Sequence, residues 1–162
     1  NGISKTGLDR AGSPLYVFRL NDKTSGSSAV LNAGSTGEIN TKTEQAVQIA
    51  LQQVGKRYVY GATGPSSFDC SGLIYYAYRQ AGFTINHRCT TYTIAQHQSP
   101  FKKRSAAEAR RGDLVICVNG GHVAILLGTP TSGAGVVHAA NEQLGVITQK
   151  SLMGPIGYYR VI

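Results

Sequence analysis

The sequence of 162 residues lacks the spacings of common zinc sites, because neither Cys-x-x-Cys nor His-x-x-x-His occurs in it. It also lacks an apolar run long enough to span a membrane, and it has no signal peptide at its start, Asn1. No internal repeat or low-complexity segment is present. We therefore expect no metal and no membrane span, and we expect any export signal to have been removed or to lie outside this chain.

Cysteine is scarce, and its count of three is odd. An odd count fits one working thiol together with either a disulfide between Cys89 and Cys117 or two buried thiols. We favour buried thiols, because Cys117 lies in an apolar run where a small hydrophobic side chain fits. Cys89 lies in a polar turn, where its role is harder to assign.

Acidic residues are also few, since 8 Asp and Glu stand against 16 Lys and Arg, for a net charge of +8. Residues 41–162 carry most of this excess, with 12 basic against 5 acidic side chains. Five of the basic residues cluster within ten positions: Lys102, Lys103, Arg104, Arg110 and Arg111. This charge indicates a polyanionic setting. No aromatic residues interleave the cluster and no nucleic-acid-binding motif occurs, so we expect no nucleic acid as a partner.

The composition changes near residue 40. Residues 1–40 are rich in Gly, Ser, Asn and Thr, and their one sustained apolar stretch is 15–20. We expect an extension or linker there, with the stretch at 15–20 as the part that could pack on the following domain. Residues 41–162 are predicted to form a single domain, because 41% of the chain is hydrophobic and that is enough for one core.

This domain is predicted to place its helices first and its strands afterwards. A capping-box pattern at 41–44 predicts the start of a helix that ends at Gly55. Further helices are predicted at 70–81 and 90–98, and a turn at 105–111. Strands are predicted at 113–118, 122–128, 135–140, 145–149 and 157–161. The order predicts an α+β fold with an antiparallel meander.

The segment Phe68 to Leu73 places a cysteine in the first turn of a predicted helix. Phe68 and Leu73 have the spacing of a hydrophobic staple. Asp69 is a preferred N-cap residue type, so Cys70 should be the first helical residue. Unpaired N–H groups at a helix start favour a thiolate, whereas the charge of Asp69 opposes it. The sequence therefore predicts a thiol whose pKa is lowered by the helix and which needs a base nearby.

Two histidines stand in strand contexts that could supply this base. His122 opens the second strand of a predicted hairpin whose turn is 119–121, and His138 lies in the apolar run 136–140. Attack by Cys70 on a carbonyl, proton transfer by His122 and orientation of His122 by His138 would form a Cys-His-His triad. The backbone N–H of Cys70 could hold the developing oxyanion.

At these residues the chain resembles the NlpC family of bacterial cell-wall cysteine peptidases, over about residues 43–162. The blocks that carry the resemblance are Gly55 to Ala62, Phe68 to Ile74, Arg111 to Leu114, Gly121 to Ala124 and Val137 to Ala139. They follow one another in the order of the family's own blocks. The local sequence signature around the cysteine of papain itself is absent.

The resemblance implies a papain-like α+β domain, in which the nucleophile stands at the N-terminus of a helix that packs on a C-terminal antiparallel sheet. It implies hydrolysis of an amide bond in the stem peptides of peptidoglycan, usually after the γ-linked D-glutamyl residue. Carried over by position, Cys70 is the nucleophile, His122 the base and His138 the third, polar member, and the reaction passes through a thioester. No cofactor is implied.

The resemblance also suggests substrate-binding residues. Tyr58 matches the family's tyrosine beside the nucleophile, while Asp69 and Ser71 match positions that help to hold the free amine of the stem peptide. The sequence departs from the family pattern at 60–62, where Tyr-Gly-Ala replaces Trp-Gly-Gly, and at His87, where proline is common. The walls of the pocket are therefore expected to differ from those of other members.

Family membership would further imply a secreted, monomeric protein in the cell wall or outside the cell, whose basic surface could meet anionic cell-wall polymers. Two alternatives remain open. An amidase, transpeptidase or acyltransferase of the same fold would resolve the same thioester with another acceptor. A cell-wall binding module would keep the fold without cutting. Diaminopimelate and lysine both remain compatible as the third residue of the stem.

Overall fold

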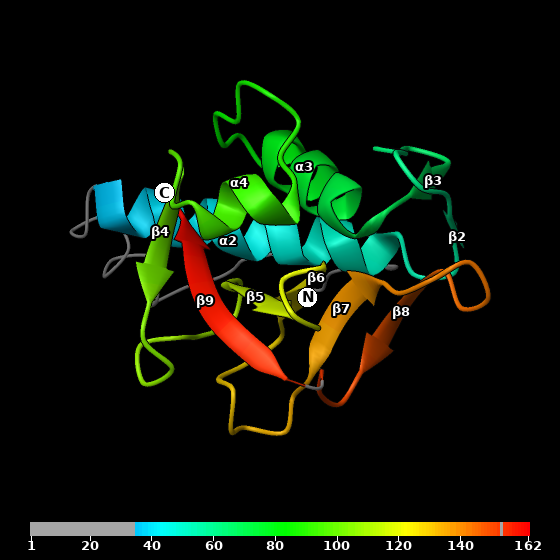
Figure 1. The fold of residues 1–162 in the computed structure, drawn as a ribbon. Helices are drawn as coiled ribbons and strands as arrows, with labels where there is room; N and C mark the ends of the chain where they lie inside the picture. Colours follow the sequence, from blue (N-terminus) through cyan, green and yellow to red (C-terminus); the bar gives the residue numbers. More distant parts are fainter. Residues whose placement is uncertain (1–34, 153) are drawn as a thin grey trace, which may run out of the picture. The chain divides into compact units, whose positions relative to one another are not determined.

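A computed structural model describes residues 35–152 and 154–162 of the chain (Figure 1). Backbone contacts divide the chain into two units, Asn1–Thr41 and Lys42–Ile162. The second unit contains every residue of the predicted site. The apolar stretch at 15–20, the part of the expected linker that could pack on the domain, lies outside the described residues, so the role of the N-terminal segment remains a prediction.

Helix α2 spans Ser35–Gln52, so the prediction that it begins at the capping box of residues 41–44 is wrong. No proline lies between Ser35 and residue 41. The helix therefore extends beyond its predicted start, because propagation adds one hydrogen bond per residue once a turn exists. Ala46, Val47 and Ala50 are the fully buried apolar residues on its described part.

The two shorter helices follow their predicted starts more closely than their predicted ends. Helix α3 spans Cys70–Gln80 and ends before Gly82, whose φ of +98° is a left-handed conformation that glycine adopts readily. Helix α4 spans only Thr91–Ala95, because Gln96 caps it and His97 takes a φ of +58°. The prediction of a helix over 90–98 was therefore too long.

Six strands form the main sheet, in the order β4-β9-β5-β6-β7-β8, with every pair antiparallel. They are β4 (Phe101–Arg104), β5 (Leu114–Cys117), β6 (His122–Leu126), β7 (Val136–Ala139), β8 (Val146–Gln149) and β9 (Pro155–Val161). The α+β class with helices first is confirmed. The predicted simple meander holds only for β5 to β8, because β9 returns to lie between β4 and β5 (Figure 1).

Three strands were not predicted. Strand β4 is an edge strand whose Lys102 and Lys103 side chains are exposed, and consecutive charged residues do not show the alternation that predicts a strand. Charged side chains are in fact common on edge strands, where they prevent pairing with other chains. Strands β2 (Arg57–Tyr58) and β3 (Ser67–Phe68) form a parallel pair just before α3. Each of these strands has only two residues, which is too short for an alternation of polar and apolar side chains to be recognised in the sequence.

The core lies on both faces of the central strands, since every residue of β5 and β7 and all but the first of β6 are buried. Because side chains alternate between faces, Val115, Ala124, Leu126 and Val136 share one face, where they form a cluster with Ala109, Leu152 and Tyr158. The alternate residues are fully buried too. Helix α3 packs on β6 and β7, and this contact brings its N-terminus to the start of β6.

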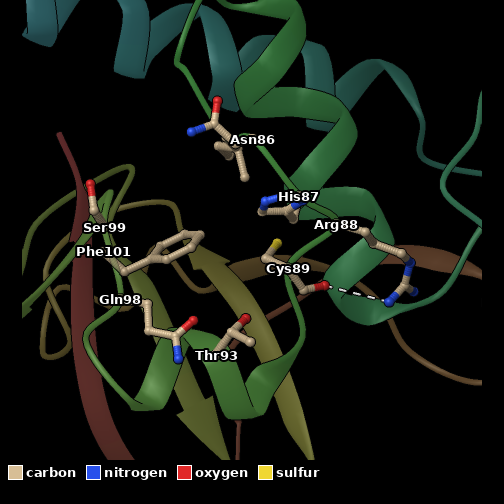
Figure 2. Close-up of a pocket in the computed structure, with 9 residues that line it drawn as sticks. Asn86, His87, Arg88, Cys89, Thr93, Gln98, Ser99 and Phe101 are labelled. Carbon is tan, nitrogen blue, oxygen red and sulfur yellow. Dashed lines mark hydrogen bonds between the residues drawn. The ribbon is translucent and has the colours of Figure 1, made fainter.

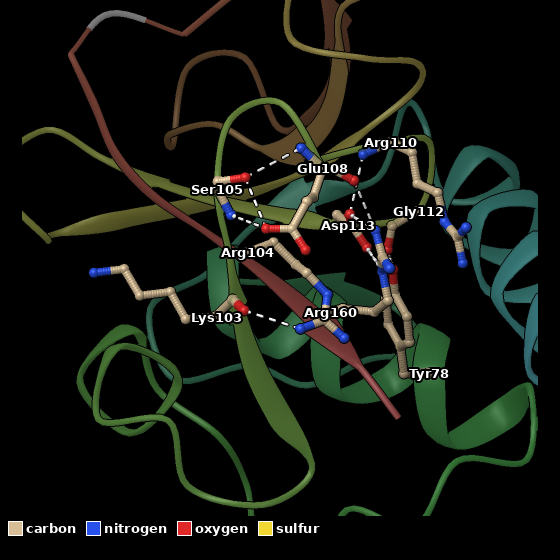
Figure 3. Close-up of polar contacts among 9 residues, drawn as sticks. All are labelled: Tyr78, Lys103, Arg104, Ser105, Glu108, Arg110, Gly112, Asp113 and Arg160. Carbon is tan, nitrogen blue, oxygen red and sulfur yellow. Dashed lines mark hydrogen bonds and ion pairs between the residues drawn. The ribbon is translucent and has the colours of Figure 1, made fainter.

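A buried ion pair joins the start of β5 to β9 (Figure 3). The carboxylate of Asp113 is 1% exposed and accepts from Nε of Arg160 at 2.8 Å and from its Nη2 at 2.7 Å. The backbone N–H of Arg110 donates to the same carboxylate at 3.0 Å. The hydroxyl of Tyr78, on α3, donates to the carbonyl of Gly112 beside it. These contacts connect helix α3, the turn that leads into β5, and strand β9.

Candidate active site

Cys70 is the first residue of α3, as the sequence predicted. Asp69 caps the helix, because its Oδ1 accepts from the backbone N–H of Gly72 at 2.7 Å, and its Oδ2 accepts from that of Gly61 at 2.8 Å. A Cβ at Gly72 would lie 2.0 Å from the carbonyl oxygen of Ala62, so only glycine fits there. The glycine-rich loop and the helix start therefore hold the cysteine in one fixed position.

The thiol of Cys70 is partly exposed and lies beside β6, where the backbone N–H of Val123 hydrogen bonds to it. Burial raises its pKa, and the charge of Asp69 raises it further. The N–H groups of Val123, Ser71 and Cys70 itself act in the opposite direction and only partly offset the burial. The prediction that the helix start would lower the pKa was wrong, because desolvation disfavours the thiolate more than these donors favour it.

The two predicted histidines meet across neighbouring strands. Nε2 of His122, at the start of β6, lies 2.7 Å from Nδ1 of His138 on β7, with the rings at 76° to each other. Val123, which contacts the thiol, directly follows His122. The structure thus pairs the two histidines and places the residue that follows His122 against the thiol of Cys70.

Both imidazoles have lowered pKa values. Burial, with a smaller contribution from the charge of His138, lowers the pKa of His122 to about 4. Burial also lowers the pKa of His138, and this effect is partly offset by the hydrogen bond that the ring donates to Gln149, which raises the pKa. Near neutral pH the site therefore rests as a neutral thiol beside two neutral imidazoles, a state in which a histidine can accept a proton.

A fourth polar side chain extends this row and was missed by the sequence analysis. Nε2 of His138 lies 3.0 Å from Oε1 of Gln149, at the end of β8. The amide nitrogen of Gln149 donates to the carbonyl oxygen of Ser151 at 2.8 Å. A glutamine at the exposed end of a strand carries no sequence signal, because only the register of β7 against β8 brings it to the ring.

The predicted substrate-binding residues surround the nucleophile. Tyr58 lies on β2, partly exposed, and its pKa is raised by burial first and then by the nearby charges of Cys70, Asp69, Glu142 and Tyr60. Ser71 and Asp69 are each 5% exposed. The structure therefore leaves Tyr58 as the most accessible of the three predicted residues.

Arg88 forms an ion pair with Asp69, with Nη2 2.6 Å from Oδ2. No pattern in the sequence had assigned a role to Arg88. Because Asp69 raises the pKa of the Cys70 thiol, a guanidinium on the same carboxylate offsets part of that charge. With Gly61 and Gly72 as its other donors, the carboxylate is held by three hydrogen bonds.

A small cavity of about 120 Å³ lies beside the segment 85–89 (Figure 2). It is lined by His87, Cys89 and Phe101, among others, and not by Cys70. Burial raises the pKa of Cys89 to about 12, so this thiol is inert under ordinary conditions. Cys89 and Cys117 are both free and buried, which confirms the prediction of buried thiols over a disulfide.

The residues of the predicted basic cluster differ in their surroundings. Lys102 and Lys103 are exposed on β4, whereas Arg111 is paired with Glu44 at 2.8 Å. In the described ranges 35–152 and 154–162, no three or more His, Cys, Asp or Glu side chains are grouped as a metal site would require. No helix of the same ranges has the length and apolarity needed to cross a membrane.

Comparisons with known proteins identify relatives of this chain. The model of the NlpC/P60 family matches residues 55–155. A probable endopeptidase of Corynebacterium glutamicum is 32% identical over 136 residues, which cover 83% of this chain and 57% of that protein. The chain thus spans little more than half of this relative.

Two solved structures are also similar. The NlpC/p60 domain of the peptidoglycan hydrolase SagA is 29% identical, with a TM-score of 0.58, over 74% of this chain and 98% of that one. The peptidoglycan hydrolase RipB of Mycobacterium tuberculosis has a TM-score of 0.62 at 24% identity, over 82% of this chain and 70% of that one, and this likeness concerns the fold alone. The predicted papain-like fold is therefore confirmed.

Proposed function

Because the chain belongs to the NlpC/P60 family of peptidoglycan hydrolases and endopeptidases, we propose that it is a cysteine endopeptidase that cuts an amide bond in the stem peptides of peptidoglycan. One observation supports this proposal above the others. The Cys70 thiol stands at a helix start and is hydrogen bonded to the backbone N–H of Val123, and the preceding residue, His122, is hydrogen bonded to His138. This is the arrangement of a nucleophile, a base and a residue that orients the base.

The proposed reaction begins from the neutral thiol and imidazole. As the sulfur of Cys70 attacks the carbonyl carbon, its proton passes to His122, and the backbone N–H of Cys70 faces the developing oxyanion. The imidazolium of His122 then protonates the leaving amine as the amide bond breaks, which leaves a thioester. Water, deprotonated by His122, attacks the thioester and releases the acid and the thiol.

We place the scissile bond between the γ-linked D-glutamyl residue and the diamino acid, with Tyr58, Asp69 and Ser71 beside the part of the stem that precedes it. Tyr58 is the accessible member and would contact the peptide directly. The carboxylate of Asp69 already accepts three hydrogen bonds, one of them from Arg88. A free amine of the substrate would therefore share the negative charge of Asp69 with the Arg88 guanidinium. The substrate would be met in the cell wall or outside the cell.

A digest of purified peptidoglycan tests this proposal. The protein is incubated with sacculi that contain lysine and with sacculi that contain diaminopimelate, and the soluble products are identified by mass spectrometry. We expect free stem fragments that begin at the diamino acid. Products that carry an added amine would identify a transpeptidase or acyltransferase, and sacculi that bind the protein without releasing peptides would identify a binding module; either result would overturn the proposal.

The pKa shifts predict the pH dependence of the thiol. Iodoacetamide reacts with the thiolate, and the pKa of Cys70 is raised above the ordinary 9.0 of the free side chain. The alkylation rate should therefore keep rising with pH beyond pH 9, without a plateau near neutrality. Mass spectrometry of the labelled peptide locates the reaction, and Cys89, with a pKa raised to about 12, serves as the internal control.

Hydrolysis should follow the imidazole instead. His122 must be unprotonated to accept the thiol proton, and its pKa is lowered to about 4, so activity is present above that pH and is lost as the pH falls through it. An ordinary histidine would place this loss near pH 6.5. A thiolate plateau in the alkylation profile, or an acid limb of hydrolysis near pH 6.5, would contradict the neutral resting state.

A further inference from the structure

Four groups form a continuous hydrogen-bonded row across three neighbouring strands. The row runs from His122 on β6 to His138 on β7, then to Gln149 on β8, and ends at the carbonyl of Ser151. Its three links measure 2.7, 3.0 and 2.8 Å. The first two members belong to the proposed catalytic site, whereas the last two lie beyond it.

The far end of the row fixes the direction of its hydrogen bonds. A carbonyl oxygen can only accept, so the atom of Gln149 that faces Ser151 is its amide nitrogen. The amide oxygen Oε1 then faces His138, and it too can only accept. Nε2 of His138 must therefore carry a hydrogen and donate it to Gln149.

The position of the hydrogen on His138 in turn determines that on His122. A neutral imidazole carries one hydrogen on its nitrogens, so His138 with that hydrogen on Nε2 has an unprotonated Nδ1. That nitrogen accepts from Nε2 of His122, which must then hold the single hydrogen of its own ring. Nδ1 of His122 is left bare and can accept a proton.

We propose that Gln149 is a positioning residue that sets the tautomers of both histidines, so that Nδ1 of His122 is the nitrogen that accepts the proton. The proposal rests on the proposed function in one respect, namely that His122 is the base. With the amide of Gln149 reversed, every hydrogen in the row would reverse, and Nδ1 of His122 would carry a hydrogen and could accept none.

The surroundings of Gln149 argue against a role in stability. The residue is exposed and lies on β8, an edge strand of the sheet, where its side chain covers no core. Its replacement by leucine removes the acceptor of His138 without opening a cavity. A merely structural residue at this place would leave the protonation of the two rings unchanged.

Nitrogen NMR of the free protein tests the row without any substrate. The two ring nitrogens of a histidine have distinct ¹⁵N shifts according to whether they carry hydrogen, so a long-range proton–nitrogen spectrum at neutral pH assigns each tautomer. We expect the Nε2–H form for both His122 and His138. An Nδ1–H form of either ring in the native protein would overturn the proposal.

Three variants test whether the hydrogen-bond acceptor of Gln149, and no other property of its side chain, sets the tautomers of the two histidines. In Gln149→Leu the acceptor is lost, and we expect His138 to populate both tautomers. In Gln149→Glu the carboxylate can still only accept, so the Nε2–H form should be retained. Gln52→Leu makes the same exchange at an exposed position on α2 and should leave both rings as in the native protein. Unchanged tautomers in Gln149→Leu would overturn the proposal.

Peptidoglycan digestion by the same variants supplies a second readout. We expect Gln149→Leu to release stem peptides about 10- to 100-fold more slowly, by analogy with the loss of the outer hydrogen-bond partner of a metal-binding histidine. Gln149→Glu should keep most of the activity. If native protein released no peptides while its rings showed the expected tautomers, the proposed function would fail and the assignment of the row would stand.

Discussion

Replacing Cys70 with alanine should abolish the release of stem peptides while leaving the fold intact. The loss should be on the order of 10⁴-fold or more, because the thioester cannot form and water must attack the amide unaided. The side chain is partly exposed, and alanine suits a first helical turn, so the melting temperature should stay within about 2 °C of the native value. Mass spectrometry of digested sacculi and thermal unfolding measure the two effects.

Cys89→Ala is the matched control for this change. It removes a thiol from the same molecule, but one that is buried and donates a weak hydrogen bond of 3.6 Å to the carbonyl of Ser71. We expect its activity to remain within a few-fold of the native protein. Release of stem peptides by Cys70→Ala at a rate near the native one would refute the proposed nucleophile.

Replacing Asp113 with alanine should destabilise the protein by about 3 to 5 kcal/mol, the usual cost of removing one partner from a buried ion pair. The carboxylate is 1% exposed and binds Arg160 through both of its oxygens, and Arg160 is itself only 16% exposed. Its loss would leave the guanidinium of Arg160 without a carboxylate partner, although Nη2 still donates to the carbonyl oxygen of Glu108 at 2.9 Å. Urea unfolding followed by circular dichroism measures the change.

An exposed ion pair of the same domain provides the comparison. Glu44 and Arg111 meet at 2.8 Å, but their side chains are 49% and 37% exposed. Glu44→Ala should therefore cost less than about 1 kcal/mol. The double change Asp113→Ala with Arg160→Met should recover part of the loss, because no unpaired charge remains. Equal effects of Asp113→Ala and Glu44→Ala would show that burial does not govern the strength of the first pair.

The local features of the site could be predicted from the sequence because they depend on residues that are close together in the chain. Asp69 is an N-cap type directly before Cys70, and its carboxylate does cap the helix. The turn before His122 contains two glycines, and the hairpin forms there with Cys117 opposite His122. In both cases the residues that determine the geometry lie within a few positions of one another.

Features that depend on pairing between distant segments were missed or misjudged. Strand β4 exists because β9 lies beside it, about 55 positions later in the chain, and its consecutive lysines do not show the alternation that predicts a strand. The pKa of Cys70 was predicted to fall, but burial of the thiol against β6 outweighs the helix start. Neither the partner strand nor the degree of burial is encoded near the residue concerned.

By itself, the sequence determined where the helices of the site begin, which thiol and which imidazoles are candidates for chemistry, and the family that they resemble. Only the tertiary structure decided that Gln149 ends a row of hydrogen bonds, that Arg88 neutralises Asp69, and that the thiol and the imidazoles rest uncharged. The reason is physical. Caps and turns depend on contacts within a few residues, whereas solvation and hydrogen-bond direction depend on every group that folding brings near.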